Sequence, residues 1–398
     1  MNRQVLALLG LCATLVLSAC GPVPSAAWPG LATRGTLAFV AHNSQIIAVD
    51  LSIGKKVEPG GAFPPAANSG FDQFSGDPGV SSDVIVVGSQ GPTGAHSGAL
   101  FGLDPDPTKM GTPKWCLAFD TSAAERLKDY NCQLTEDAVR PIFFNITEAV
   151  DSRIIGGIAL VDGVAYFGLA NNKVYAVDAA TGREKWVFNQ AEHPIWATPL
   201  VDQDTVYIAS LDHAVYALDR ADGELKWKKD LGASLGGTPA LLDGTLYVGT
   251  FGNQLFALDA ATGKERWEKP FEAKNWIWGG PTSHEGMLYF TDLSGNVFAV
   301  DAQFGAQKWM QTPGGKMRGS PAIVDDLLFI GDKDGNVFAL HLTDGSQAWK
   351  QTIKGELYAS PVIVPEQNWV LIAPYQGDNL LVAYTSDGAL KWAFAPSQ

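Results

Sequence analysis

The sequence predicts an all-β fold, an eight-bladed β-propeller with four-stranded antiparallel blades. A five-residue phrase with alternating apolar residues, such as VYAVD at 174–178 and VFAVD at 297–301, occurs eight times in the 398-residue chain. In the six clearest copies a tryptophan follows about eight residues later, and these tryptophans recur about every forty residues. A repeat of this length, with alternating apolar positions and glycine turns, is typical of one propeller blade.

Each regular unit divides into four expected strands at its turn residues. The unit that starts at Thr198 opens on a small residue and a proline, and the later units repeat this opening, as at Ser320-Pro321. Proline fits the first residue of a strand, where no ladder N–H is yet required. From period-two alternation, the four strands of the unit at Thr198 are expected at 198–202, 205–210, 214–220 and 225–231.

The same spacing extends to the N-terminal part of the chain. It predicts a first blade at about 28–58 and a second at about 77–117, which completes eight blades over residues 28–398. The first unit has Val57 and Glu58 where the tryptophan is expected. If that unit were only a linker, seven blades would remain.

The turn between the last two strands of a blade carries a specific motif. DAATGREKW at 178–186 and DAATGKERW at 259–267 resemble the tryptophan-docking repeat of the quinoprotein (PQQ-type) propellers. In that family the indole stacks between neighbouring blades, so the resemblance implies a structural role for these tryptophans. The motif in blade eight, at 384–392, lacks the aspartate. The tryptophans expected to dock are Trp115, Trp186, Trp227, Trp267, Trp309, Trp349 and Trp392.

The N-terminus resembles a bacterial lipoprotein signal peptide. Arg3 precedes an apolar stretch at 5–16, and Leu-Ser-Ala-Cys follows at 17–20. We expect cleavage of residues 1–19, lipidation of Cys20 and a short tether at 20–27. More than one acyl chain anchors a protein stably to a membrane, and the remaining sequence has no apolar run of about 20 residues that could span one. An ordinary secretory signal with an incidental cysteine is the alternative.

Composition and cysteine usage agree with an exported chain. The formal net charge is −14, which argues against nucleic acid as a partner because its phosphates would be repelled. Cys116 and Cys132 are sixteen positions apart, and they could form a disulfide in an oxidising compartment or remain buried free thiols. No metal-binding spacing and no Ser-His-Asp grouping is found. The partial Ca²⁺-loop sequences at 292–296 and 332–336 are expected to be hairpin turns.

Three insertions interrupt the repeat, at 58–76, 89–98 and 117–153. The first and third join the last strand of one blade to the first strand of the next, and the second joins the middle two strands of its blade. Because successive strands alternate direction, these connections emerge on the same face of the disc. In the third insertion, Ser122 and Glu125 have capping-box spacing and predict a short helix that extends to about Tyr130.

The same face carries a candidate binding ring. Trp196, Trp278, Arg318 and Tyr358 stand just before the first strands of their blades, and Gly236 or Leu235 holds the equivalent place in the fifth unit. In this type of propeller the first strand lines the central channel, so these side chains should converge at its mouth. Aromatic and arginine side chains favour a binding surface. Alternatively, they pack on each other and plug the channel.

With its lipobox, its length of 398 residues and its eight expected blades, the chain resembles the BamB family of outer-membrane assembly lipoproteins. The resemblance implies a monomeric, non-catalytic scaffold that binds envelope proteins such as a β-barrel assembly complex and needs no cofactor. It would lie on the periplasmic face of the outer membrane in a diderm organism, or on the outer cell surface in a monoderm one. An exported ligand-binding or sensor propeller is the alternative. A PQQ-dependent dehydrogenase is a further one, but the Ca²⁺ ligands, Asp base and adjacent cysteines of that enzyme class are not matched here.

Overall fold

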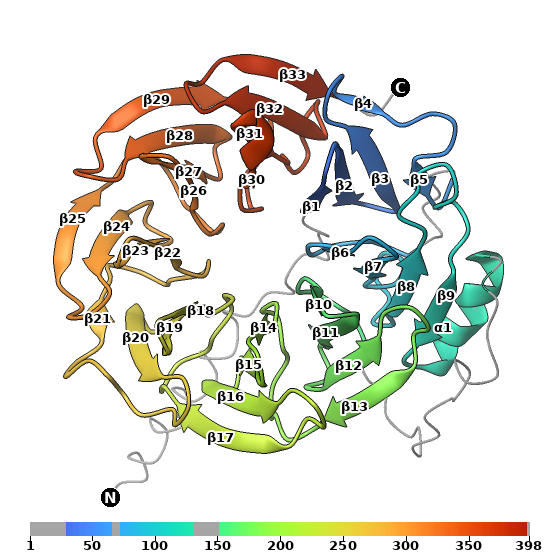
Figure 1. The fold of residues 1–398 in the computed structure, drawn as a ribbon, viewed down its shortest axis with the longest axis horizontal. Helices are drawn as coiled ribbons and strands as arrows, with labels where there is room; N and C mark the ends of the chain where they lie inside the picture. The colour runs from blue at the N-terminus through green and yellow to red at the C-terminus, as the bar shows by residue number, and fades with distance from the viewer. Residues whose placement is uncertain (1–28, 66–71, 131, 133–150, 396–398) are drawn as a thin grey trace, which may run out of the picture.

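Eight antiparallel sheets are arranged in a ring around a central channel (Figure 1). The computed structural model describes residues 29–65, 72–130, 132 and 151–395. Seven sheets have four strands and the first has five. The strands follow one another in sequence order from the channel to the rim, except that the fifth strand of the first sheet pairs with its third. The eight-bladed prediction is therefore confirmed, and the seven-blade interpretation is wrong because residues 30–63 form a complete first blade.

The first four blades contain the N-terminal half of the described chain. Blade 1 consists of β1 (Gly30–Arg34), β2 (Leu37–His42), β3 (Gln45–Asp50), β4 (Lys55–Lys56) and β5 (Ala62–Phe63). Blade 2 consists of β6 (Gly79–Val80), β7 (Ile85–Gly88), β8 (Ala99–Leu103) and β9 (Trp115–Ala118). Blade 3 consists of β10 (Ala159–Val161), β11 (Val164–Gly168), β12 (Val174–Asp178) and β13 (Glu184–Phe188). Blade 4 consists of β14 (Leu200–Val201), β15 (Thr205–Ala209), β16 (Ala214–Asp219) and β17 (Leu225–Asp230).

The other four blades complete the ring. Blade 5 consists of β18 (Ala240–Leu242), β19 (Thr245–Gly249), β20 (Gln254–Asp259) and β21 (Phe271–Glu272). Blade 6 consists of β22 (Thr282–His284), β23 (Met287–Thr291), β24 (Val297–Asp301) and β25 (Gln307–Gln311). Blade 7 consists of β26 (Ala322–Val324), β27 (Leu327–Gly331), β28 (Asn336–His341) and β29 (Gln347–Thr352). Blade 8 consists of β30 (Val362–Val364), β31 (Trp369–Ile372), β32 (Leu381–Thr385) and β33 (Leu390–Phe394), with the 3₁₀ turn η2 (Pro365–Gln367).

The first strand of a regular blade is shorter than the sequence predicts. In blade 4 the strand begins at Leu200, one residue after Pro199, and in blade 7 it begins at Ala322, one residue after Pro321. Proline lacks the N–H that a ladder hydrogen bond would require, so pairing starts only at the following residue. The other three strands of blade 4 lie where they are expected, with their ends one residue shorter.

A tryptophan hydrogen bond joins each of seven neighbouring blade pairs. Trp267 of blade 5 donates its indole Nε1–H to the carbonyl of Ala302 in the turn between β24 and β25, at 3.0 Å. The turn glycine Gly305 has a φ of 69°, and a Cβ there would lie 3.0 Å from the indole ring. The motif glycine therefore lies against the tryptophan of the preceding blade. Equivalent bonds of 2.7–3.0 Å are made by Trp115, Trp186, Trp227, Trp309, Trp349 and Trp392.

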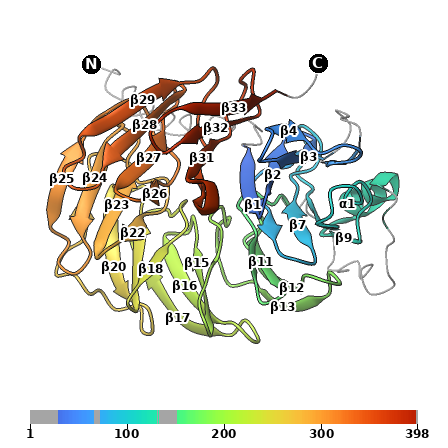
Figure 2. The ribbon, with the colours of Figure 1, turned by 45° about the horizontal axis from the view of Figure 1, so that its top comes forward.

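The ring closes between blade 8 and blade 1 without strand exchange. Each sheet contains only consecutive strands, so within residues 29–395, as far as the structure describes them, no shared hydrogen-bond ladder joins blade 8 to blade 1. Trp392 donates to the carbonyl of Leu51 at 2.8 Å, and residues of both blades form one buried cluster that includes Val49 and Leu381. Blades 8 and 1 lie side by side in the ring (Figure 2), and side-chain packing and one indole hydrogen bond close the disc.

The junction between blades 1 and 2 is different because blade 1 has no docking tryptophan. A cluster of aromatic side chains fills this interface, with Phe63 lying 5.1 Å from Phe101 and 5.6 Å from Tyr130 between ring centroids. Phe74 completes the cluster at 5.8 Å from Phe63. Phe63, Phe74 and Tyr130 come from the insertions, so the insertions provide the apolar packing that tryptophan provides elsewhere.

The third insertion begins with a helical segment at the outer edge of blade 2 (Figure 1). It consists of α1 (Thr121–Arg126) and the 3₁₀ turn η1 (Leu127–Tyr130). The expected helix is present, but the expected cap at Ser122 is wrong. Asp120 is the N-cap and accepts the N–H of Ala123 at 2.8 Å. A carboxylate oxygen is a strong acceptor for this otherwise unpaired amide.

Ion pairing and hydrogen bonds hold the three insertions together around α1. Arg126 donates from Nε to Asp72 of the first insertion at 2.9 Å and from its guanidinium to the carbonyl of Ser97 in the second. Asp120 accepts from Ser97 at 2.6 Å and also from Ser152, near the end of the third insertion. The described parts of the three insertions are therefore joined to one another around α1.

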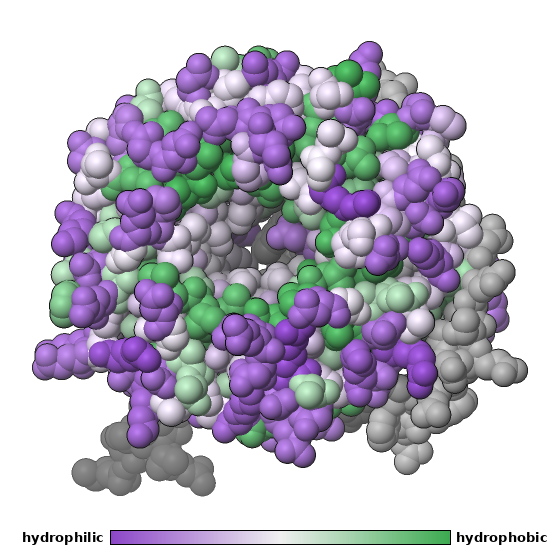
Figure 3. All heavy atoms as spheres, in the orientation of Figure 1, coloured by the Kyte–Doolittle hydropathy of each residue, from purple (hydrophilic) through white to green (hydrophobic). Residues whose placement is uncertain are grey.

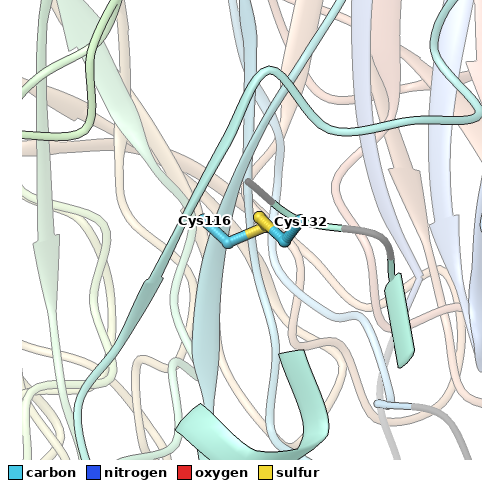
Figure 4. The surroundings of a disulfide bond; sticks show 2 residues. All are labelled: Cys116 and Cys132. Atoms are coloured by element: carbon cyan, nitrogen blue, oxygen red, sulfur yellow. A yellow bond between two sulfur atoms is a disulfide. The ribbon is translucent and has the colours of Figure 1, made fainter. Parts of the chain in front are cut away.

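A disulfide joins Cys116 in β9 to Cys132, which follows η1 (Figure 4). The two Cα atoms are 6.2 Å apart, within the usual range for such a bond. The bond attaches the end of the helical segment to the outer strand of blade 2. Neither α1 nor any other helix in the described ranges is long and apolar enough to cross a membrane. The expected signal peptide, Cys20 and tether lie outside the described residues.

Candidate functional site

A cavity of about 420 Å³ occupies one mouth of the central channel. On the face seen in Figure 3, the centre of the disc is hollowed and apolar side chains gather around the hollow, whereas hydrophilic side chains predominate toward the rim. Trp196, Trp278, Arg318 and Tyr358 all line this cavity. The structure therefore brings the four candidate ring residues together.

Each ring residue follows a fully buried one. Ile277 and Met317 are 0% exposed, whereas their neighbours Trp278 and Arg318 line the cavity. Ile195 and Leu357 hold the same place before Trp196 and Tyr358. The connection between blades is extended here, so alternate side chains point into the core between blades and into the channel.

The fifth unit resolves the alternative between Leu235 and Gly236. Leu235 is 0% exposed and belongs to the core, and Gly236 lines the cavity. The ring of Phe251 occupies the space beside Gly236, since a Cβ on that glycine would meet Phe251 at 2.5 Å. Phe251 was missed by the sequence analysis. Its signal is an aromatic residue in the turn between β19 and β20, where polar turn residues are usual.

The ring residues stack on one another along the cavity wall. The guanidinium of Arg318 lies between two aromatic rings, 4.8 Å from the centroid of Trp278 and 4.7 Å from that of Tyr358. Phe251 stacks on the opposite side at 4.9 Å from Trp278, and Trp276 stacks on Phe251 at 5.1 Å. These contacts agree with the packing alternative. Because the residues also line an open cavity, they do not fill the channel mouth completely.

Stacking and burial determine the electrostatics of the wall. Cation–π contact with two rings holds the Arg318 charge in one place. Burial, followed by the hydrogen bond to Glu356, raises the pKa of the Tyr358 hydroxyl to about 12. Tyr358 therefore stays neutral at physiological pH and donates to Glu356.

The insertions form the opposite wall of the cavity. Each one contributes residues to it: Asp77 comes from the connection that ends the first insertion, His96 from the second and Arg153 from the third. Arg153 forms an ion pair with Asp151 at 2.6 Å, and His96 contacts the same carboxylate at 3.2 Å. The expectation that insertions and ring lie on one face therefore agrees with the positions of these residues.

The connections that precede the first strands of neighbouring blades are in close backbone contact. Gly279 of one connection touches Gly319 of the next, and a Cβ on Gly279 would lie 2.7 Å from the Gly319 backbone. Gly237 meets the connection at Gly279 and Gly280 in the same way. Glycine at these positions allows neighbouring blades to approach, and it removes side chains from the channel wall. The cavity consequently has large side chains at its mouth and backbone further in.

The partial Ca²⁺-loop sequences are hairpin turns, as predicted. Asp292 accepts two hydrogen bonds from the Asn296 side chain, at 3.0 and 2.9 Å, and Asp332 accepts two from Asn336. Both carboxylates are 0% exposed. Within the described residues there is no cluster of three or more His, Cys, Asp or Glu side chains placed to hold a metal ion.

The sequence matches the family model for the outer membrane protein assembly factor BamB over residues 147–351 and 212–392, which together cover more than half of the chain. The chain belongs to the BamB family. The crystal structure of BamB from Moraxella catarrhalis has the same fold, with a TM-score of 0.65 and 19% sequence identity over 89% of this chain and 93% of that one. The crystal structure of the computationally designed Ika8 protein is similar too, with a TM-score of 0.66 and 11% identity over 94% and 98% of the two chains. No curated protein matches the sequence.

Within the BamB family match, blades 4 to 8 provide the aromatic and Arg318 wall of the cavity. The insertion wall lies in blade 2 and at the start of blade 3, mostly outside the matched residues. This BamB-family propeller thus combines a regular repeat on one side of the channel with an elaborated segment on the other.

Proposed function

We propose that this protein is a non-catalytic, lipid-anchored scaffold of the bacterial cell envelope that mediates protein–protein interaction during the assembly of outer-membrane β-barrel proteins. Membership of the BamB family, whose model describes an outer membrane protein assembly factor, carries the proposal. The partner is a component of a β-barrel assembly complex. The protein acts as a monomer that binds no nucleic acid and needs no cofactor.

The lipobox at 17–20 supports the anchor. Lipidation of Cys20 would attach the propeller through a short tether, to the periplasmic face of the outer membrane in a diderm organism. Such an anchor restricts the scaffold to the membrane surface where β-barrel proteins assemble. A high local concentration of scaffold and partner raises the occupancy of a weak interface.

The elaborated face is the proposed docking face. All three insertions contribute residues to the cavity on this face, beside Trp278, Arg318 and Tyr358. Tryptophan, tyrosine and arginine dominate the binding energy of protein interfaces. The opposite turns are short and repetitive, and their side chains satisfy their own backbones, as when Asp344 accepts the N–H of Ser346 at 2.8 Å.

Two sets of substitutions test this assignment. One set changes Trp278, Arg318 and Tyr358, and the control set changes Asp222, Thr262 and Asp344 in the turns between the outer two strands. Binding to the purified assembly complex is compared at equal yield of folded protein. Each hot-spot change should weaken binding by about 2 kcal/mol or more, about thirtyfold, and each control change by less than about 0.5 kcal/mol.

Equal loss from both sets, or loss from the control set alone, would contradict the docking face. If purified wild-type protein does not bind a β-barrel assembly complex at all, the proposed function itself is wrong.

A further inference from the structure

Ring residues stand at a fixed distance from the first hairpin of their blades. Arg318 lies six residues before Val324, where β26 ends and pairs across a tight turn with the start of β27. Counting back six residues from the ends of β22, β18 and β10 gives Trp278, Gly236 and Ile155. All four residues line the channel-mouth cavity. The hairpin of a blade therefore predicts which residue of the preceding connection reaches the channel mouth.

The same count in blade 1 leads to Trp28. β1 ends at Arg34, which pairs with Leu37 three residues later, just as Val324 pairs with Leu327 in blade 7. The residue six positions before Arg34 is Trp28, which lies outside the described residues. Because the hairpin of blade 1 has the same register as that of blade 7, the sequence position of Trp28 is that of a ring residue.

The first described residue agrees with this register. Pro29 lines the cavity, as do Gly279 and Gly319, which follow the ring residues Trp278 and Arg318 in the same way. The chain therefore enters the propeller at the channel mouth. A residue that precedes proline is restricted to extended backbone, and the connections at the other ring positions are extended too.

Contacts with blade 2 fix the start of β1 at this mouth. The backbone N–H of Leu31 donates to Asp77 Oδ1 at 2.9 Å, and Asp77 lines the cavity. Gly30 lies so close to the backbone of Gly76 that a Cβ on it would be 1.8 Å from the Gly76 carbonyl oxygen. Because consecutive Cα atoms are about 3.8 Å apart, the residue before Pro29 begins within side-chain reach of the cavity.

We propose that Trp28 is the ring residue of blade 1 and docks at the channel mouth, between Tyr358 of blade 8 and Asp77 of blade 2. Its indole extends the aromatic wall to which Trp196, Trp278 and Tyr358 belong. A tryptophan side chain buries a large apolar area and pairs favourably with other aromatic rings. The indole is covalently joined to the rim of the cavity, so its docking is intramolecular and occurs at a high effective concentration.

Docking of Trp28 determines where the N-terminal segment leaves the disc. The eight residue steps from Cys20 to Trp28 span at most about 30 Å when extended. With lipid on Cys20, a consequence that rests on the proposed function, the anchor stays within that distance of the channel mouth and the elaborated face is turned toward the membrane. The docking of Trp28 itself does not depend on lipidation.

Fluorine NMR of the whole protein labelled with 5-fluorotryptophan tests the position of this indole. The resonance that is lost in Trp28→Phe belongs to Trp28, and the one lost in Trp276→Phe belongs to Trp276, which is 45% exposed and serves as the reference. With a soluble gadolinium chelate, the Trp28 resonance should broaden at least about threefold less than that of Trp276, because a docked indole is largely buried. Broadening of Trp28 equal to that of Trp276 would overturn the proposal.

A second pair of variants tests where Trp28 is buried. Tyr358→Ala removes the neighbouring ring and should shift the Trp28 resonance. Phe304→Ala is the matched control, since Phe304 is 72% exposed in the turn between β24 and β25, and it should leave that resonance in place. The other tryptophan resonances report whether each variant is folded, and Tyr358→Leu, which retains apolar volume, replaces the alanine variant if it is not.

A protected Trp28 whose resonance ignores both Tyr358 variants would lie elsewhere, and the assignment to the ring would be wrong. These spectra do not involve a partner protein or a lipid. Failure to bind a β-barrel assembly complex, or unchanged detergent partitioning of Cys20→Ser, would contradict the proposed function and leave the docking of Trp28 untouched.

Discussion

Replacement of Trp267 by alanine should produce a large loss of stability through one defined inter-blade contact. Its side chain is 6% exposed, it donates to the Ala302 carbonyl at 3.0 Å, and its ring lies 5.7 Å from that of Tyr247. A buried tryptophan removes about 150–250 Å² from water, which corresponds to about 4–6 kcal/mol at about 25 cal/mol per Å². Because the unfolded chain already buries part of this area, about 3–5 kcal/mol is the expected loss.

Two further variants separate the contributions to this loss. Trp267→Phe removes the indole hydrogen bond, although the Ala302 carbonyl still accepts from the Tyr247 hydroxyl at 2.9 Å. The smaller ring also leaves a cavity, so the total cost should be about 1–3 kcal/mol. Trp276→Ala is the control, because Trp276 is 45% exposed and loses mainly its stack on Phe251, worth about 0.5–1.5 kcal/mol. Urea unfolding followed by far-UV circular dichroism measures all three without depending on tryptophan fluorescence.

The order of the losses tests the docking argument. Trp267→Ala should cost the most, Trp267→Phe less and Trp276→Ala the least. If Trp267→Ala costs no more than Trp276→Ala, the indole does not hold blades 5 and 6 together, and the structural role assigned to the repeated tryptophans is wrong.

Three other perturbations test the insertions, the core and the anchor. Arg126→Met should lower the free energy of unfolding in urea by about 3–5 kcal/mol, because it leaves the carboxylate of Asp72, 1% exposed, without its ion-pair partner. Lys128→Met is the control and should lower it by less than about 1 kcal/mol, since the Lys128 side chain is 61% exposed. Similar losses from the two variants would contradict the buried-pair assignment. Burial raises the pKa of Tyr175 from 10.0 to about 12, so its contribution to stability should be complete below pH 10 and fall as the pH rises toward 12. The Tyr175→Phe variant should lose less stability than the wild type over this interval. An identical pH profile for the two proteins would exclude Tyr175 as a cause. Cys20→Ser should move the protein from membranes to a soluble exported fraction, and unchanged detergent partitioning of the variant would rule out lipidation at this residue.

Part of the candidate site could be located from the sequence because repeats place equivalent residues in equivalent positions. Trp278, Arg318 and Tyr358 precede the first strands of successive blades at a constant offset, so their convergence follows from the propeller geometry alone. Phe251 could not be found in this way. It lies in a turn between middle strands and reaches the ring only because Gly236 leaves space beside it.

Local signals predicted the helical segment but not its boundary. Ser122 and Glu125 have the spacing of a capping box, yet Asp120 forms the cap. The carboxylate of Asp120 also accepts hydrogen bonds from Ser97 and Ser152, which are distant in sequence. Contacts between the three insertions therefore determine where the helix begins.

The sequence by itself determined the number of blades and the docking motif, because period-two alternation, turn glycines and a repeat of about forty residues are local properties of the chain. Only the tertiary structure decided how the ring closes and how insertions replace the missing tryptophan of blade 1. These features depend on contacts between residues far apart in the chain. The hydrogen bond from Trp392 to Leu51 joins opposite ends of the propeller, and no local pattern encodes such a pair.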